Sequence, residues 1–174
     1  MSRLLVSVGI DPGMQGGICI LSSEDGPRVM PMPLLGGEID VKGVQYLLQE
    51  LGEDEMHAPS IVVSIEKAQA MPGQGVTSMF SYGKGFGALC AVVQCVGLRL
   101  ELVTPQSWKK HVLAGTPKDK DAAVDYVTRA FPAVSLLASP RSRKPHDGIA
   151  DAVCIAEFGW RVYLGQVPRA GAGS

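Results

Sequence analysis

The sequence predicts an α/β fold with a mixed five-stranded sheet flanked by helices. Strand-like runs at 4–11, 16–21 and 28–32 follow one another through short turns, which is typical of an antiparallel meander. Two later runs, at 60–66 and 98–103, come after helix-length segments, and parallel neighbours in one sheet need such crossovers. The antiparallel and parallel strands are therefore expected to share one sheet.

Two of these strands end in a carboxylate. Apolar residues run almost unbroken from Leu4 to Ile10, which suits a strand buried on both faces, and the run stops at Asp11 before a Pro-Gly turn. The β-branched run at 60–66 ends in the same way, at Glu66. A rigid strand fixes the position of an acid at its end, as a catalytic site requires. The alternative is that Asp-Pro-Gly is only a tight turn.

Helices are predicted between and after the strands. Asp40 caps the first, and Thr104 followed by Pro105 is a helix start. The predicted segments are 41–51, 78–96, a helix from Thr104–Pro105 to a break at 115–117, 118–131, and a last helix from His146 or Asp147 to about 164. The helix 78–96 contains many small residues, which we expect another backbone to approach closely, from this chain or a partner.

Length and composition predict one domain over 1–165, followed by a Gly/Ala/Ser-rich tail, 166–174, that we expect to be disordered. The apolar runs are too short for a membrane span, and the start lacks a signal-peptide pattern. The four cysteines lie in apolar stretches and are interpreted as reduced core thiols. These features predict a cytoplasmic protein.

The basic residues are unevenly distributed. The net charge is −1, so overall charge does not indicate nucleic-acid binding. Half of the 16 basic residues, however, lie between Lys109 and Lys144. A clustered basic face can bind phosphates even in a neutral protein. The alternative for any single lysine is a solvated helix surface.

A second acidic pair is predicted on the last helix. Asp147 and Asp151 are four residues apart and share one helix face, against an apolar surface. Two such carboxylates would repel each other and resist desolvation, and a divalent cation removes both penalties. With Asp11 and Glu66 there are acids enough for two ions, which can activate water for hydrolysis of a phosphodiester. The alternative for Asp147 is an ordinary acid favoured by the helix dipole.

These motifs resemble the RuvC Holliday-junction resolvases. The resemblance runs from Leu4 to about Tyr163 and is nearest to phage-borne members. It rests on Val8–Gly13, Ile65–Glu66, Met71–Gly75 and His146–Ala152. It implies a ribonuclease-H-like fold of the retroviral-integrase superfamily and a homodimeric, metal-dependent endonuclease. It further implies that four-way DNA is cut in recombination and repair, and that the dimer forms through the helix 78–96.

The resemblance makes Asp11, Glu66 and Asp151 metal-binding catalytic acids. Cellular members have an Asp or His three residues before the last aspartate, where this chain has Gly148. Asp147 is the natural substitute and His146 a weaker candidate, although a shift of one residue turns a helical side chain by roughly 100°. The implied cofactor is Mg²⁺, with Mn²⁺ able to substitute and two ions in each site.

Several residues are candidates for contact with DNA. Lys120 and one of Lys109 or Lys110 match basic positions that the family uses near scissile phosphates, and Lys120 is assigned a catalytic role. The other basic candidates are Lys118, Arg141, Arg143 and Lys144. Where the family often has a base-stacking aromatic residue, this chain has Gln69, and Phe80 or Tyr82 is an alternative.

Three other functions are open at this point. An ATPase or sugar-kinase-like domain also begins with a strand, an acid and a glycine turn, but needs a second domain. A non-catalytic junction-binding module is disfavoured because acids that face DNA weaken binding unless a cation intervenes. A related nuclease acting on other branched or single-stranded DNA is the nearest alternative. The preferred prediction is the junction resolvase, in a bacterial or phage-infected cell.

Overall fold

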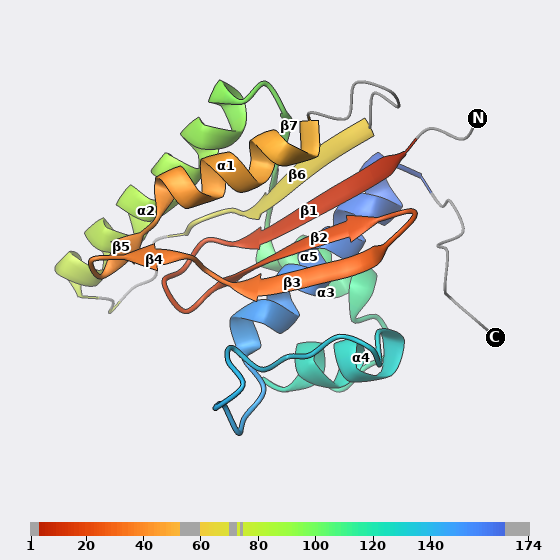
Figure 1. Ribbon diagram of the computed structural model, residues 1–174. Helices are drawn as coiled ribbons and strands as arrows, with labels where there is room; N and C mark the ends of the chain where they lie inside the picture. The colour runs from red at the N-terminus through yellow and green to blue at the C-terminus, as the bar shows by residue number, and fades with distance from the viewer. Residues whose placement is uncertain (1–3, 53–59, 70–72, 74, 166–174) are drawn as a thin grey trace.

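The protein is described here by a computed structural model that covers residues 4–52, 60–69, 73 and 75–165. Its main sheet has five strands in the order β3-β2-β1-β6-β7 (Figure 1). The strands are β1 (Leu5–Asp11), β2 (Gly17–Ser22), β3 (Gly26–Pro31), β6 (Ser60–Glu66) and β7 (Arg99–Val103). β1, β2 and β3 pair antiparallel, whereas β1, β6 and β7 pair parallel. The predicted mixed five-stranded sheet is confirmed.

A small second sheet follows β3 and was not predicted from the sequence. It pairs β4 (Leu34–Leu35) with β5 (Glu38–Ile39). Gly36 and Gly37 form its two-residue turn with φ values of 62° and 81°. Positive φ at both turn positions is the geometry of the hairpin turns that match the twist of paired strands, and glycine adopts it without strain.

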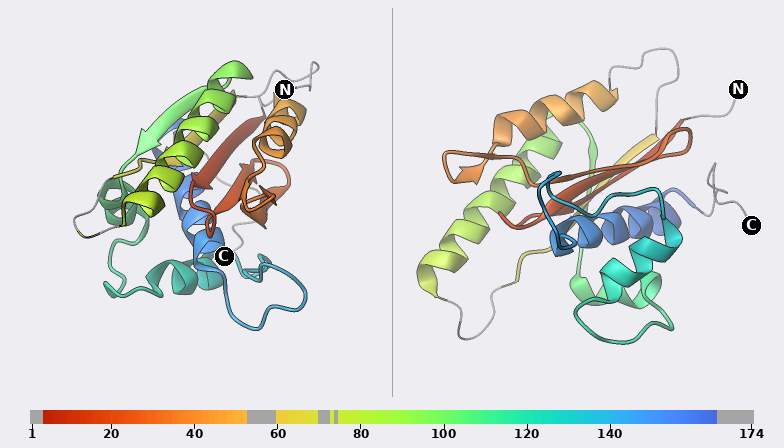
Figure 2. Two further views of the ribbon diagram at one scale, coloured as in Figure 1. Left: turned by 90° about the vertical axis from the view of Figure 1, so that its left-hand side faces the viewer. Right: turned by 60° about the horizontal axis from the view of Figure 1, so that its bottom comes forward.

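Helices cover both faces of the sheet, and Figure 2 shows the resulting three layers. The helices are α1 (Val41–Gly52), α2 (Val76–Cys95), α3 (Pro105–Val112), α4 (Ala122–Ala130) and α5 (Asp147–Tyr163). Successive residues of a strand face opposite sides, so Val8 and Ile10 join the core beneath α1 and α2. Gly9, between them, faces α5 on the other side of the sheet. Among the described residues, no helix is long and apolar enough to cross a membrane.

Close packing of α5 on β1 depends on Gly9. A Cβ atom at this position would lie 2.2 Å from the carbonyl oxygen of Ala152 and 2.2 Å from the nitrogen of Ala156. Any side chain here would push the helix off the sheet, so the glycine lets two backbones come into contact. This contact fixes the N-terminal half of α5 beside the C-terminal end of β1.

Three details differ from the sequence predictions or lie outside the described residues. The fourth helix begins at Ala122 and not at 118, because residues 119–121 form a bend and a turn in which Asp119 Oδ1 accepts the Asp121 N–H at 3.1 Å. Cys19 and Cys154 are buried as predicted, but Cys95 is exposed, so the prediction of four core thiols was wrong there. The predicted tail, 166–174, lies outside the described residues.

Candidate active site

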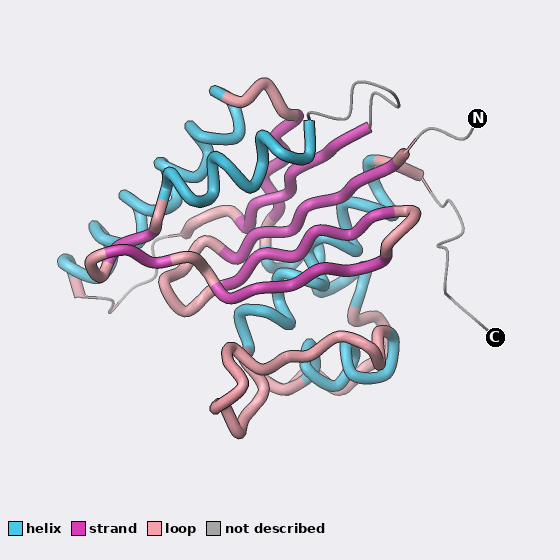
Figure 3. The backbone as a smooth tube through the Cα atoms, viewed as in Figure 1, coloured by secondary structure: helices cyan, strands magenta, loops and turns pink. Residues whose placement is uncertain are grey.

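Asp11 and Glu66 end two neighbouring parallel strands. Ile10 pairs with Ile65 in register, so the two acids follow at the same edge of the sheet. Asp151 reaches this edge from α5, which Gly9 holds against β1. Segments far apart in the sequence therefore bring three carboxylates to the edge where β1 and β6 end. Figures 1 and 3 show α5 crossing behind the sheet with its N-terminal end toward this edge.

The carboxylates act on one another electrostatically. Burial, reinforced by the negative charge of Glu66, raises the pKa of Asp11 to about 6, against a weak Gly13 N–H contact at 3.4 Å and the positive charge of Lys109. Burial also raises the pKa of Asp151 to about 7, with Asp11 as the next contribution and Glu66 and Asp147 adding to it. Lys109 opposes this shift as well. The acids are close enough to disfavour each other's charge.

The structure at the start of α5 bears on which residue is the candidate for the fourth acidic position. His146 caps the helix, and its Nδ1 accepts the Ile149 N–H at 3.2 Å. Gly148 lies against the main chain, where a Cβ atom would be 2.2 Å from the carbonyl oxygen of Gln15. Position 148 therefore has no room for a ligand side chain. Asp147, the first residue of α5, is exposed and shares a hollow with Asp151.

This hollow has a volume of about 780 Å³, and its charged lining residues are four lysines and three aspartates. It is formed by α3, the connection to α4 and the start of α5, and it is lined by the four predicted lysines Lys109, Lys110, Lys118 and Lys120. The structure therefore places these lysines around the same hollow as Asp147 and Asp151. Arg141, Arg143 and Lys144 do not line it: they are exposed on the connection from α4 to α5, at the bottom of Figure 1.

Trp108 is a residue of the site that sequence reasoning did not identify. Its indole Nε1 donates a hydrogen bond to Glu66 Oε2 at 2.6 Å, and its side chain is fully buried. In the sequence, Trp108 and Val112 form an ordinary apolar stripe on a short helix. A tryptophan beside two lysines is the only local signal that could have singled it out.

The candidates for base stacking lie in different settings. Gln69 is exposed three residues after β6. Phe80 is 75% exposed on α2, so it does not pack in the core of this chain. Tyr82, on the same helix, lies nearer the acids: burial, followed by the charges of Asp11 and Glu66, raises its pKa to about 12.

The carboxylate oxygens are the type of ligand atom that a hard divalent cation prefers. Mg²⁺ and Mn²⁺ prefer oxygen ligands, and the mutual repulsion of Asp11 and Asp151 is what a bound cation relieves. Their atoms do not form a closed cage, since no group of three or more His, Cys, Asp or Glu side chains in the described ranges is arranged to hold an ion. A cation would have to draw the acids together.

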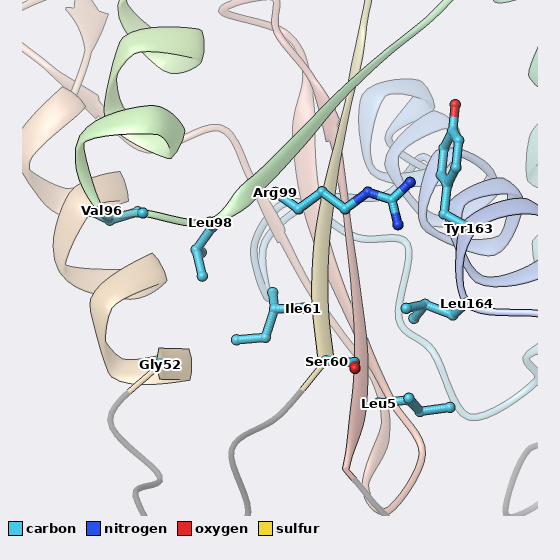
Figure 4. A pocket seen from close by; sticks show the side chains of 10 residues that line it. Leu5, Gly52, Ser60, Ile61, Val96, Leu98, Arg99, Tyr163 and Leu164 are labelled. Atoms are coloured by element: carbon cyan, nitrogen blue, oxygen red, sulfur yellow. The ribbon is translucent and has the colours of Figure 1, made fainter.

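A second hollow, of about 680 Å³, lies at the opposite end of the sheet (Figure 4). The charged residue in its lining, Arg99, is paired with Glu101. Arg99 Nη2 lies 2.7 Å from Glu101 Oε1, and its guanidinium lies 5.2 Å from the ring centre of Tyr163. None of the predicted site residues lines this hollow.

Comparison with known proteins identifies the fold. No protein-family profile and no curated protein sequence matches the chain. Among solved structures, RuvC of T. thermophilus in complex with a Holliday junction substrate is 18% identical, with 97% of this chain and 100% of that chain covered and a TM-score of 0.56.

Two further structures give the same result. Thermus thermophilus RuvC is 18% identical, with 92% of this chain and 97% of that chain covered and a TM-score of 0.54. The yeast mitochondrial Holliday junction resolvase Ydc2 is 16% identical, with 88% of this chain and 76% of that chain covered and a TM-score of 0.53. The chain therefore has the ribonuclease-H-like fold of the RuvC-type resolvases, as the sequence resemblance implied.

Proposed function

We propose that this protein is a structure-specific endodeoxyribonuclease that resolves Holliday junctions, acting as a homodimer in a bacterial or phage-infected cell. The observation that carries the proposal is the convergence of Asp11, Glu66 and Asp151 at one edge of the sheet, beside a hollow lined by four lysines. The same fold occurs in a RuvC structure with a Holliday junction substrate, which supports four-way DNA as the substrate here.

In this proposal the acids bind divalent ions. Asp11, Glu66 and Asp151 are the main ligands, and Asp147 is the fourth, since position 148 has no room for one. Mg²⁺ is the proposed ion, with Mn²⁺ able to replace it and two ions in each site. When bound, the ions supply an activated water and stabilise the leaving oxygen of the phosphodiester.

The basic residues hold the DNA around the acids. Lys120 lines the hollow with Asp151, where its charge would stabilise the negative charge that develops on the phosphate. Lys109 acts on both Asp11 and Asp151, so it offsets part of their charge before substrate binds. The remaining candidates give salt-dependent contacts to the backbone of the DNA: Lys110, Lys118, Arg141, Arg143 and Lys144.

A dimer through α2 is supported by its exposed face. Phe80 and Val76 are 75% and 84% exposed on this helix. A Cβ atom at Gly83 or Gly87 would meet nothing within 4 Å, so packing within the chain does not require these glycines. Close approach of a partner helix would, and a two-fold dimer supplies two sites for two symmetric cuts. Sedimentation should show a dimer, and Gly87→Arg should shift it towards monomer.

The experiment that tests the proposal offers labelled four-way, three-way, linear and single-stranded DNA with Mg²⁺, with Mn²⁺ or with neither. We expect paired, symmetric nicks in the four-way DNA only when an ion is present. Preferred cleavage of three-way or single-stranded DNA would instead indicate the related nuclease activity. Binding of junctions without cleavage under every ion would indicate a non-catalytic module.

A further inference from the structure

We infer that Trp108 is a positioning residue that fixes the carboxylate of Glu66 and, through it, the affinity of the site for divalent ions. This inference rests on the proposed function and assigns a role to a side chain outside the carboxylate set. The two residues are joined by the hydrogen bond from Trp108 Nε1 to Glu66 Oε2, at 2.6 Å.

The chemistry of the pair suits positioning. An indole has one N–H donor and no acceptor, so its hydrogen bond can run in one direction only. The Trp108 side chain is fully buried, and a bond from a buried donor to a carboxylate is stronger than a neutral one. One oxygen of Glu66 is therefore held at a fixed point, which also sets the direction of the other.

The helix that carries Trp108 is itself fastened at both ends. At its start, Thr104 Oγ1 accepts the Ser107 N–H at 3.2 Å. At its end, Arg161 Nη1 donates to the carbonyl oxygen of His111 at 3.1 Å. The indole therefore contacts Glu66 from a helix whose two ends are fixed by hydrogen bonds, as a positioning residue requires.

A neutral donor suits this place better than a cation. A lysine or arginine at position 108 would pair with Glu66 and compete with a metal ion for the same carboxylate. The indole N–H orients the carboxylate and leaves its negative charge in place. Groups that hydrogen-bond to metal ligands commonly change metal affinity by about 10- to 100-fold when they are removed.

The test compares two buried tryptophans. Trp108→Phe removes the N–H and keeps an aromatic ring, and Trp160→Phe makes the same change on α5, in the same core. Mn²⁺ binding to the DNA-free full chain is measured by electron paramagnetic resonance, and thermal unfolding is followed in parallel. We expect about tenfold weaker binding for Trp108→Phe and a change within about twofold for Trp160→Phe. Equal weakening in both would overturn the inference.

A double-mutant cycle tests whether Trp108 acts through Glu66. In a Glu66→Gln background, Trp108→Phe should weaken Mn²⁺ binding no further. A full additional loss in that background would show that the effect does not run through Glu66. If the wild type binds Mn²⁺ and Trp108→Phe binds it equally well, this inference alone fails. Absence of Mn²⁺ binding by the wild type would contradict the proposed function as well.

A second measurement leaves Trp108 intact. The chain has two tryptophans, so Trp160→Phe retains only the indole of Trp108. The chemical shift of its indole N–H, observed by nuclear magnetic resonance, should change as Mg²⁺ is added. The Mg²⁺ concentration at the midpoint of this change should equal the midpoint of Mg²⁺ binding measured independently. In Trp160→Phe with Glu66→Gln the change should be lost. If Mg²⁺ binds but the chemical shift of the Trp108 indole N–H does not change, the inference is contradicted. This result does not depend on whether Trp108→Phe folds.

Discussion

Hollows of similar size, about 780 and 680 Å³, lie at the two ends of the central sheet. The charged side chains at the two ends are arranged differently. At the far end, Arg99 is paired with Glu101 at 2.7 Å. At the acid end, Asp11 and Asp151 face other carboxylates, and burial with like charge raises the pKa of both. The charge at the far end is therefore paired locally, whereas the acid end gathers buried carboxylates that repel one another, beside lysines of the adjoining hollow.

This difference separates structural charge from functional charge. A paired surface ion is satisfied by its neighbour and contributes little to stability. Buried carboxylates that repel one another weaken the folded state, and such perturbed groups concentrate at functional sites. The acid end is therefore expected to respond to cations and to substitution in ways that the far end does not. The substitutions and the change of pH described below test this contrast.

The largest effect is expected for Asp11→Asn. Loss of this ligand should reduce single-turnover cleavage of four-way DNA by on the order of a thousandfold or more, because the ions would lose the carboxylate at the end of the central strand. Binding of the junction without divalent ions, measured by gel shift, should remain. Glu101→Gln, at the far end, is the matched control and should cleave normally. Retained cleavage by Asp11→Asn would remove Asp11 from the site.

Lys120→Ala should give the next largest effect. It removes a positive charge from the hollow that Asp151 also lines, a charge that we propose stabilises the negative charge developing on the phosphate, so cleavage should slow by roughly 10- to 100-fold. The affinity for the junction should fall much less. Lys42→Ala, an exposed lysine on α1, is the control and should change neither quantity. Equal losses of rate and affinity would make Lys120 a docking residue only.

Stability should depend on pH in a definite direction when divalent ions are chelated. Asp11 and Asp151 lose their protons near pH 6 and 7 when folded, against an ordinary pKa of 3.8. The folded chain therefore binds more protons between these values, so this contribution to the free energy of unfolding is present below about pH 4. It is lost as the pH rises to about 7, and added Mn²⁺ should restore stability at the upper end.

Asp151→Asn isolates this contribution. With chelator at pH 8 it should raise the free energy of unfolding by on the order of 1–2 kcal/mol, and the gain should vanish near pH 4. Denaturant unfolding at the two pH values measures it. Glu101→Gln should instead lower the free energy of unfolding by up to about 1 kcal/mol, because it breaks the ion pair with Arg99. Destabilisation by Asp151→Asn at pH 8 would show that the acid end is not under electrostatic strain.

The smallest effects repeat the contrast between paired and unpaired groups inside the core. Ser7 Oγ donates to the carbonyl oxygen of Ala156 at 2.7 Å, whereas the buried Ser64 Oγ has no hydrogen-bond partner within the part of the chain that the structure describes. Ser7→Ala should lower the free energy of unfolding by about 1 kcal/mol, and Ser64→Ala should change it by less than about 0.5 kcal/mol or raise it. Equal losses would indicate that both hydroxyls are paired.

The features that sequence analysis predicted are local. An apolar run that stops at an acid predicts both the strand and the position of Asp11 or Glu66 at its end. Asp40 and Thr104 predict helix starts, and in the structure the side chains of both accept a backbone N–H at a helix start. The hairpin of β4 and β5 was missed because two-residue strands are too short to show a period. The bend and turn at 119–121 were missed because their residues suit a helix equally well.

The remaining features arise from tertiary contacts. The bond between Trp108 and Glu66 joins residues 42 apart, and an apolar stripe gives no sign of a polar partner. Position 148 has no space for a side chain because the main chain at Gln15 lies against it, and the local sequence gives no sign of this contact. Cys95 is exposed because α2 presents that face outward, which its apolar neighbours in the sequence do not indicate.

The most direct test of the central claim is a crystal soaked with Mn²⁺ and measured at the manganese absorption edge. The acid end should show an anomalous peak within ligand distance of Asp11, Glu66 and Asp151, and the hollow at Arg99 should show none. The peak should disappear in Asp11→Asn. A wild-type crystal with these three carboxylates pointing to separate regions and no manganese between them would contradict the claim.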